Sequence, residues 1–278
     1  MNTTHNLKKN ISDSVLYLTQ RLRSYPAICL FVRSGTVELN YVGAIHQRIP
    51  ITDVPHCNDI PQSQDCSFYE ATIEGIPVIL YENPHSEVDS TSFFQELYPL
   101  HIIANLGIRC LVTIDQIEFF SSVKNHDILI INDHINHTGI NAVKSLETVH
   151  DFEERMKKFS MEYSESLVKI CETAFEKQQI KYKKAILIGV TSPSTLSKAE
   201  QSIYASFKAD CIGNIQVLEA IAARYYSMHI CTLVVQKLSS SHIDSTLLNE
   251  RRQHLYGIIN FILPNIYQYL ATTSNEIS

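Results

Sequence analysis

The most informative stretch of the chain for its fold is Gly213-Asn-Ile-Gln-Val-Leu-Glu-Ala-Ile-Ala-Ala-Arg224. A glycine precedes apolar residues that recur at helical spacing, which predicts a helix over residues 217–226. On both sides, short continuous apolar runs alternate with amphipathic segments, and such runs are typical of strands buried on both faces. The runs cover residues 27–32, 110–114, 128–131, 185–190 and 231–235. We therefore expect one α/β domain over residues 1–278, built on a mixed central β-sheet covered by helices.

The other expected elements follow from periodicity, caps and turn residues. Ser12 is the expected N-cap of the first helix, Gly107 ends the second, and Pro264 bends or interrupts the last. The expected helices cover residues 12–24, 93–106, 161–179, 197–207 and 243–270. Glu74-Gly75 should turn a hairpin between residues 68–73 and 78–81. The variable stretch over residues 33–67, with prolines at Pro50, Pro55 and Pro61, is expected to be mostly loop, and residues 271–278 a frayed tail.

Charge and composition exclude several kinds of partner. The chain of 278 residues has a net charge of -6 and no basic block, so neither nucleic acid nor an anionic membrane is an expected partner. No apolar run reaches membrane-spanning length, and the polar first twelve residues lack the apolar core of a secretory signal. The seven cysteines show no metal-ligand spacing and mostly lie in apolar runs. We expect reduced cysteines, a cytoplasmic protein, and neither a metal nor a cofactor.

Two further observations bear on ligands. Asp133, His134 and His137 lie close together, but no acidic cluster completes a ligand set, so polar groups at the end of a strand are favoured over a metal site. Glycine is scarce, with 8 residues in 278 against a usual share of about 7%. Loops that bind phosphate use glycine to let backbone N–H groups converge on the anion. This composition argues against tight phosphate binding.

Two stretches carry a resemblance to a known family. Gly213 to Arg224 resembles the Gly-Met-Ser-x-Val-Pro-Glu-x-x-x-Ala-Arg segment of trimeric purine nucleoside phosphorylases, and residues 127–139 resemble their Gly-Asp-x-x-x-Ile-x-Asp-His-Ile-Asn-x-x-Gly segment. The resemblance extends over roughly residues 15–270. It implies a sheet curled into a distorted barrel, purine nucleoside and phosphate as ligands, and a homotrimer. In that trimer residues 155–161 would reach the neighbouring site, with Met156 near the place of an aromatic residue.

The resemblance places phosphate contacts at Ser34, Asn83, His85 and Ile215. Ser34 and His85 match the family, whereas Asn83 replaces an arginine and Ile215 replaces a serine. An amide cannot supply the charge or the two-pronged donor geometry of a guanidinium. The implied phosphate site is therefore degenerate.

The implied nucleoside contacts are changed as well. Leu196 stands where the family has a glutamate that holds the purine edge, Asn214 replaces a methionine against the ribose, and Glu87 replaces a tyrosine. Gln236 replaces the asparagine that polarises purine N7, so Gln236 and His85 hold the degenerate catalytic positions. The late histidine that contacts the ribose 5′-hydroxyl corresponds to His242 or Asp244.

Acidic residues add to these losses. Residues 114–118, Ile-Asp-Gln-Ile-Glu, replace the small residues of the family's Asn-Ala-Ala-Gly-Gly. Carboxylates near the implied phosphate position repel an anionic co-substrate. They are Glu38, Glu82, Asp115 and Glu118.

Three functional interpretations follow. The first is a non-catalytic relative with weak or no affinity for purine nucleoside and phosphate, kept for assembly or for binding, which leaves room for an unknown protein partner. The second is an active phosphorylase or nucleosidase of altered specificity. The third is an α/β module of unrelated function. The changed site residues favour the first, and a filled cavity between Ser34, His85, Leu196 and Gln236 would support it.

Overall fold

The computed structural model describes residues 2–33, 35–60, 63–83, 93–121, 123, 128–143, 163–237 and 245–274. Within these residues nine strands form one sheet in the order β2-β3-β4-β1-β5-β8-β7-β6-β9. The strands are β1 (Ile28–Arg33), β2 (Ala44–Pro50), β3 (Ser67–Ile73), β4 (Ile76–Asn83), β5 (Cys110–Phe119), β6 (Ile128–Asn136), β7 (Tyr182–Gly189), β8 (Cys211–Gly213) and β9 (His229–Gln236).

One half of the sheet closes on itself. Strand β5 pairs with β8 on one side and with β9 on the other, so β5, β8, β7, β6 and β9 form a five-stranded barrel. Both parallel pairs, such as β1–β5 and β5–β9, and antiparallel pairs, such as β6–β9, are present. The remaining strands extend from β5 as an open wing. The prediction of a mixed sheet curled into a distorted barrel is confirmed.

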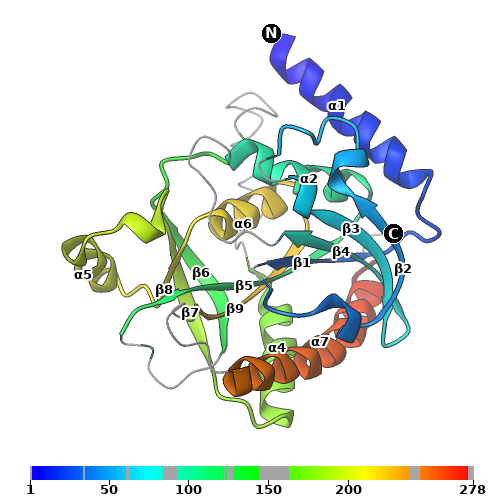
Figure 1. Ribbon diagram of the computed structural model, residues 1–278. Coiled ribbons are helices and arrows are strands. Elements are labelled where there is room, and N and C mark those ends of the chain that lie inside the picture. The colour runs from blue at the N-terminus through cyan, green and yellow to red at the C-terminus, as the bar shows by residue number, and fades with distance from the viewer. Residues whose placement is uncertain are drawn as a thin grey trace.

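Helices cover the sheet in two groups (Figure 1). They are α1 (Asn2–Thr19), α2 (Phe93–Asn105), α4 (Glu165–Lys177), α5 (Lys198–Ser206), α6 (Ile215–Tyr225) and α7 (Ser245–Ser274). Helices α1, α2 and α6 pack together over one apolar core, and α4 and α7 pack together over the other. Helix α5 projects from the barrel, and none of its residues is buried (Figure 1). No helix in the described ranges is both long enough and apolar enough to cross a membrane.

Several local predictions are confirmed. Strands β3 and β4 form the expected hairpin, and its two turn residues, Glu74 and Gly75, have φ of 49° and 79°. Two successive positive φ angles are typical of the turn that suits a two-residue hairpin. Helix α2 starts at Phe93, and Gly107, with φ of 89°, follows its end.

Other local predictions are wrong. Helix α1 starts at Asn2, so Ser12 lies inside it, and its Oγ donates to the Lys8 carbonyl at 2.9 Å instead of capping the helix. Strand β2 occupies a segment for which no strand was predicted. Helix α7 continues past Pro264 and reaches Ser274, so the first four residues of the expected frayed tail are helical.

Candidate functional site

A buried arginine stands at the end of β1, where the chain enters the first of the predicted phosphate loops. Arg33 is 1% exposed, and its guanidinium pairs two-pronged with Glu219 of α6. Nη1 donates to Oε2 at 3.0 Å, and Nη2 donates to Oε1. Burial alone would lower the pKa of Arg33, but the nearby carboxylates of Glu219, Asp115 and Glu96 together outweigh burial and raise it. Arg33 is therefore a charged group whose two terminal nitrogens pair with Glu219.

A second carboxylate faces the same guanidinium. Asp115 of β5 is fully buried, and its Oδ2 lies 3.9 Å from Arg33 Nη1. Asp115 also accepts hydrogen bonds from the Gln116 backbone N–H at 2.7 Å and from Gln216 Nε2 at 2.5 Å. Burial raises the pKa of Asp115 to about 6, although Arg33 and these hydrogen bonds oppose the shift. Ionisation of Asp115 is therefore less favourable than that of a solvent-exposed aspartate.

The first turn of α6 fixes these groups in place. Asn214 caps the helix, and its side chain accepts from the Ile215 N–H at 2.6 Å. Gln216 accepts from the Asn214 N–H at 2.9 Å while it donates to Asp115. Ile215 is fully buried in the apolar core beneath α6. The predicted phosphate position at Ile215 is therefore part of the packed core, whereas the predicted ribose position, Asn214, is a helix cap.

Asn83, at the end of β4, is 1% exposed and donates from Nδ2 to Oε2 of Glu96 at 3.0 Å. Glu96, on α2, is 4% exposed. Burial raises the pKa of Glu96, and the charge of Arg33 opposes the shift. Asn83, which stands where the family has an arginine, therefore donates a hydrogen bond to the buried carboxylate of Glu96.

Gln236, the predicted catalytic amide, is the last residue of β9, and its side chain bonds to the end of β5. Its Oε1 accepts from the Phe119 N–H at 3.1 Å, and the next residue, Lys237, donates its N–H to the Ile117 carbonyl at 2.8 Å. Strand β5 pairs with β9 without a register shift from Cys110 to Ile117. Residues 114–118 contain no glycine and pair with β9 and β8, so they continue the strand instead of turning into a loop.

Leu196 lines a hollow of about 240 Å³, partly open to solvent, beneath α5. The other lining residues are Glu118, Phe119, Phe120, Pro193, Ser194, Gln201 and Ile212. An adjoining hollow of only about 20 Å³ shares Glu118, Pro193 and Ile212 and is lined further by Gln116, Ile117, Gly213, Asn214 and Lys237. Space therefore remains beside Leu196, while Gln236 turns its carboxamide oxygen to β5.

Several predicted residues lie outside the described ranges. They are Ser34, His85, Glu87, Met156, His242 and Asp244. Of the predicted site, the structure brings Asn83, Asn214, Ile215 and Gln236 to the strand ends around the buried charges, and it places Leu196 farther out beside α5. Sequence reasoning assigned no role to Arg33, Glu96 or Gln216. A charged residue at the end of a continuous apolar run was the available signal, because a buried charge needs a partner.

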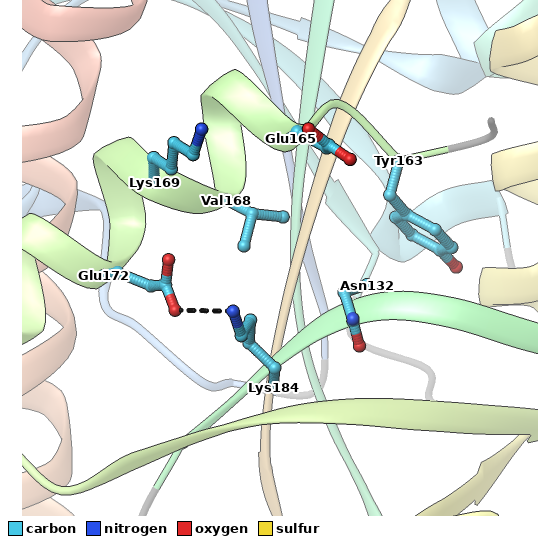
Figure 2. A pocket seen from close by; sticks show the side chains of 7 residues that line it. All are labelled: Asn132, Tyr163, Glu165, Val168, Lys169, Glu172 and Lys184. Atoms are coloured by element: carbon cyan, nitrogen blue, oxygen red, sulfur yellow. Dashed lines mark ion pairs between the residues drawn. The ribbon is translucent and has the colours of Figure 1, made fainter. Parts of the chain in front are cut away.

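A separate hollow of about 180 Å³ lies between α4 and the strands β6 and β7 (Figure 2). Lys184 and Glu172 form an ion pair of 3.0 Å across it. Its lining residues are Asn132, Tyr163, Glu165, Val168, Lys169, Glu172 and Lys184. The lining carries both signs of charge and includes none of the predicted site residues.

Comparison with known proteins agrees with this architecture. The model of the phosphorylase superfamily matches residues 119–245. Purine nucleoside phosphorylase 1 of Bacillus subtilis is 24% identical over 232 residues, covering 81% of this chain and 83% of the relative. Purine nucleoside phosphorylase 1 of Geobacillus stearothermophilus is 21% identical over 245 residues, covering 86% and 88%.

Solved structures show the same fold. A Schistosoma purine nucleoside phosphorylase in complex with hypoxanthine superposes with a TM-score of 0.73 at 16% identity, covering 92% of this chain and 96% of that chain. The Schistosoma mansoni enzyme complexed with a monocyclic inhibitor gives 0.72 at 17% identity, covering 91% and 96%. The fold is that of the purine nucleoside phosphorylase structures. The matched region is similar to the phosphorylase superfamily, and the two bacterial relatives are purine nucleoside phosphorylases.

Proposed function

We propose that this chain is a purine nucleoside phosphorylase-like protein that has lost phosphorolysis, or retains it only strongly reduced, and is kept for binding or assembly. The observation that carries the proposal is the buried cluster around Arg33. One guanidinium there is paired with Glu219 and faced by Asp115. A nucleophilic phosphate would have to enter beside carboxylates instead of beside free cations.

The charge balance of the cluster opposes an anionic co-substrate. The carboxyl groups of Asp115, Glu219 and Glu96 are all buried, whereas Arg33 is the positive charge that opposes them. Like charges a few ångströms apart in a poorly solvated site repel by several kcal/mol at an effective dielectric of about 20. Fixing a phosphate beneath an anomeric carbon requires the opposite arrangement.

The leaving-group side is compromised too. Charge developing on a departing purine needs donors or acceptors that are free to meet it. Gln236 is bonded to the Phe119 N–H, and Leu196 offers neither a donor nor an acceptor. The structure therefore offers neither a cationic site for the attacking phosphate nor free polar groups for the departing purine.

The test is turnover of inosine and guanosine by the purified protein with phosphate. We expect a rate at least about a thousandfold below the ordinary enzymatic value of about 10 per second. The Bacillus subtilis relative, assayed in parallel, is the positive control. A rate near 10 per second from this chain would overturn the proposal.

A second candidate function is a nucleosidase of altered specificity, in which water takes the place of the phosphate that the buried carboxylates exclude. The same assay without phosphate tests this alternative: release of free purine base at a rate that does not depend on phosphate would favour hydrolysis over loss of activity.

We further propose a homotrimer in the cytoplasm. The family resemblance supports the trimer, and the seven cysteines, all free and buried, suit a reducing compartment. Light scattering at micromolar protein should give three times the chain mass of 31.6 kDa. A monomeric mass would refute the trimer.

A further inference from the structure

The carboxylate of Asp115 accepts two hydrogen bonds and faces a guanidinium, and these three groups belong to separate parts of the fold. Gln216 Nε2, from α6, donates at 2.5 Å, and the Gln116 N–H, from β5, donates at 2.7 Å. Arg33 Nη1, at the end of β1, lies 3.9 Å away. Backbone N–H, amide and guanidinium groups that converge on one carboxylate are the arrangement by which proteins bind oxyanions.

The ion pair with Glu219 does not require Asp115. The guanidinium already makes a two-pronged pair with Glu219, which balances its charge. Asp115 is thus a second carboxylate near a guanidinium whose charge Glu219 already neutralises. Arg33 Nε, fully buried, has no hydrogen-bond partner among the described residues. The guanidinium therefore retains one donor that the Arg33–Glu219 pair does not use.

We propose that Gln216, the Gln116 N–H and Arg33 form an internal oxyanion site whose permanent occupant is the tethered carboxylate of Asp115. The side chain supplies the anion from within the chain, so the site is closed to a free anion of similar shape. The ligand chemistry of the emptied site is that of a small monocarboxylate. A larger dianion such as phosphate would be opposed by Glu219 and Glu96, which remain in place.

The test is to empty the site and offer it a free anion. Asp115→Ala removes one carboxyl group and leaves a space of that size, which formate fits in shape and charge. We expect sodium formate, from about 1 to 100 mM, to raise the melting temperature of Asp115→Ala by about 2–4 °C relative to the same concentration of sodium chloride. The wild-type protein, whose site is occupied, should show no such difference.

Asp115→Asn is the matched control. It removes the charge but fills the space, so formate should leave its melting temperature unchanged. Sodium phosphate serves as the second probe, and we expect it to give Asp115→Ala a shift well below that of formate. Should Asp115→Ala not fold, Asp115→Ser leaves a smaller space and carries the same comparison.

Two outcomes would overturn the inference. One is a folded Asp115→Ala or Asp115→Ser protein that formate does not stabilise beyond chloride. The other is equal stabilisation of the variant, the wild type and Asp115→Asn, which would mean a general salt effect. Because the readout is anion binding and not turnover, its failure is distinguishable from a failure of the proposed loss of phosphorolysis.

Discussion

At the scale of single residues, Arg33 is the residue on which the site depends. A buried ion pair adds little net stability compared with well-packed apolar groups, yet removing one partner leaves an unpaired buried charge. Replacing Arg33 with methionine would leave both Glu219 and Asp115 without a cation. Removing one member of the cluster should therefore lower the free energy of unfolding considerably. The sequence alone did not predict this cluster.

We expect Arg33→Met to lower the free energy of unfolding by about 3–5 kcal/mol in urea denaturation. The double variant Arg33→Met/Glu219→Gln should recover part of the loss, because it no longer buries the second carboxylate unpaired. A loss below about 1 kcal/mol in the single variant would show that water reaches the cluster.

The pKa of Asp115 predicts a pH dependence. Its ordinary value is 3.8 and its folded value is about 6, so the native state binds more protons than the unfolded state between these limits. The contribution of Asp115 to stability is therefore largest below pH 3.8 and is lost as pH rises through 6. The Asp115→Asn variant has no carboxyl group to ionise here, so it does not lose stability in this way as pH rises. Its free energy of unfolding relative to wild type should rise across this window by up to about 3 kcal/mol, and a difference that is flat with pH would contradict the assignment.

At the scale of elements, the sequence predicted the buried strands well but not their ends. The apolar run at residues 110–114 predicted the start of β5, whereas the structure continues the strand to Phe119. The extension depends on pairing with β9 and β8, which lie about a hundred residues away along the chain. A local pattern containing Asp115 and Glu118 cannot reveal such pairing. In contrast, Ser197 and Glu200 form a local capping box, and α5 starts where the sequence predicts.

The bond between Gln236 and the Phe119 N–H tests this extension of β5. We expect Gln236→Ala to destabilise the protein by about 1 kcal/mol, because a backbone donor loses its acceptor. Amide hydrogen exchange at Phe119 should become faster, and exchange within the core of β5 should not change. Gln201→Ala, on the exposed face of α5, is the control and should alter stability by less than about 0.5 kcal/mol. Unchanged protection at Phe119 in Gln236→Ala would indicate that strand pairing alone holds this end.

At the scale of the whole molecule, the fold survives with little sequence identity. A TM-score of 0.73 at 16% identity means that the barrel and its helices are retained while most side chains differ. The family resemblance predicted this fold and the changed chemistry at Asn83, Leu196 and Ile215. It could not predict the Arg33–Glu219 pair, because the partners lie 186 residues apart and neither belongs to a local pattern that names the other.

The buried Arg33–Glu219 pair, which the resemblance did not predict, determines which substitutions would restore a phosphate site. Restoring the family residues at the four degenerate positions leaves Arg33 and Asp115 where they are. The four changes are Asn83→Arg, Leu196→Glu, Ile215→Ser and Gln236→Asn. Ile215→Ser also removes a fully buried side chain from the core, at a cost of about 2–5 kcal/mol. We therefore expect the fourfold variant, checked for folding by near-ultraviolet circular dichroism, to show no phosphate binding in calorimetry.

Adding Arg33→Gly, Glu219→Gln and Asp115→Ala, which removes the paired charges of the buried cluster together, should produce phosphate binding with a Kd of about 1 mM. The cluster then no longer fills the site, and Glu96, which contacts position 83, faces the restored arginine. The triple variant Arg33→Gly/Glu219→Gln/Asp115→Ala without the four restorations is the control and should not bind, because it has space but no arginine in the second loop. Phosphate binding by the fourfold variant, with Arg33 and Asp115 still present, would mean that the buried cluster is not what excludes the anion.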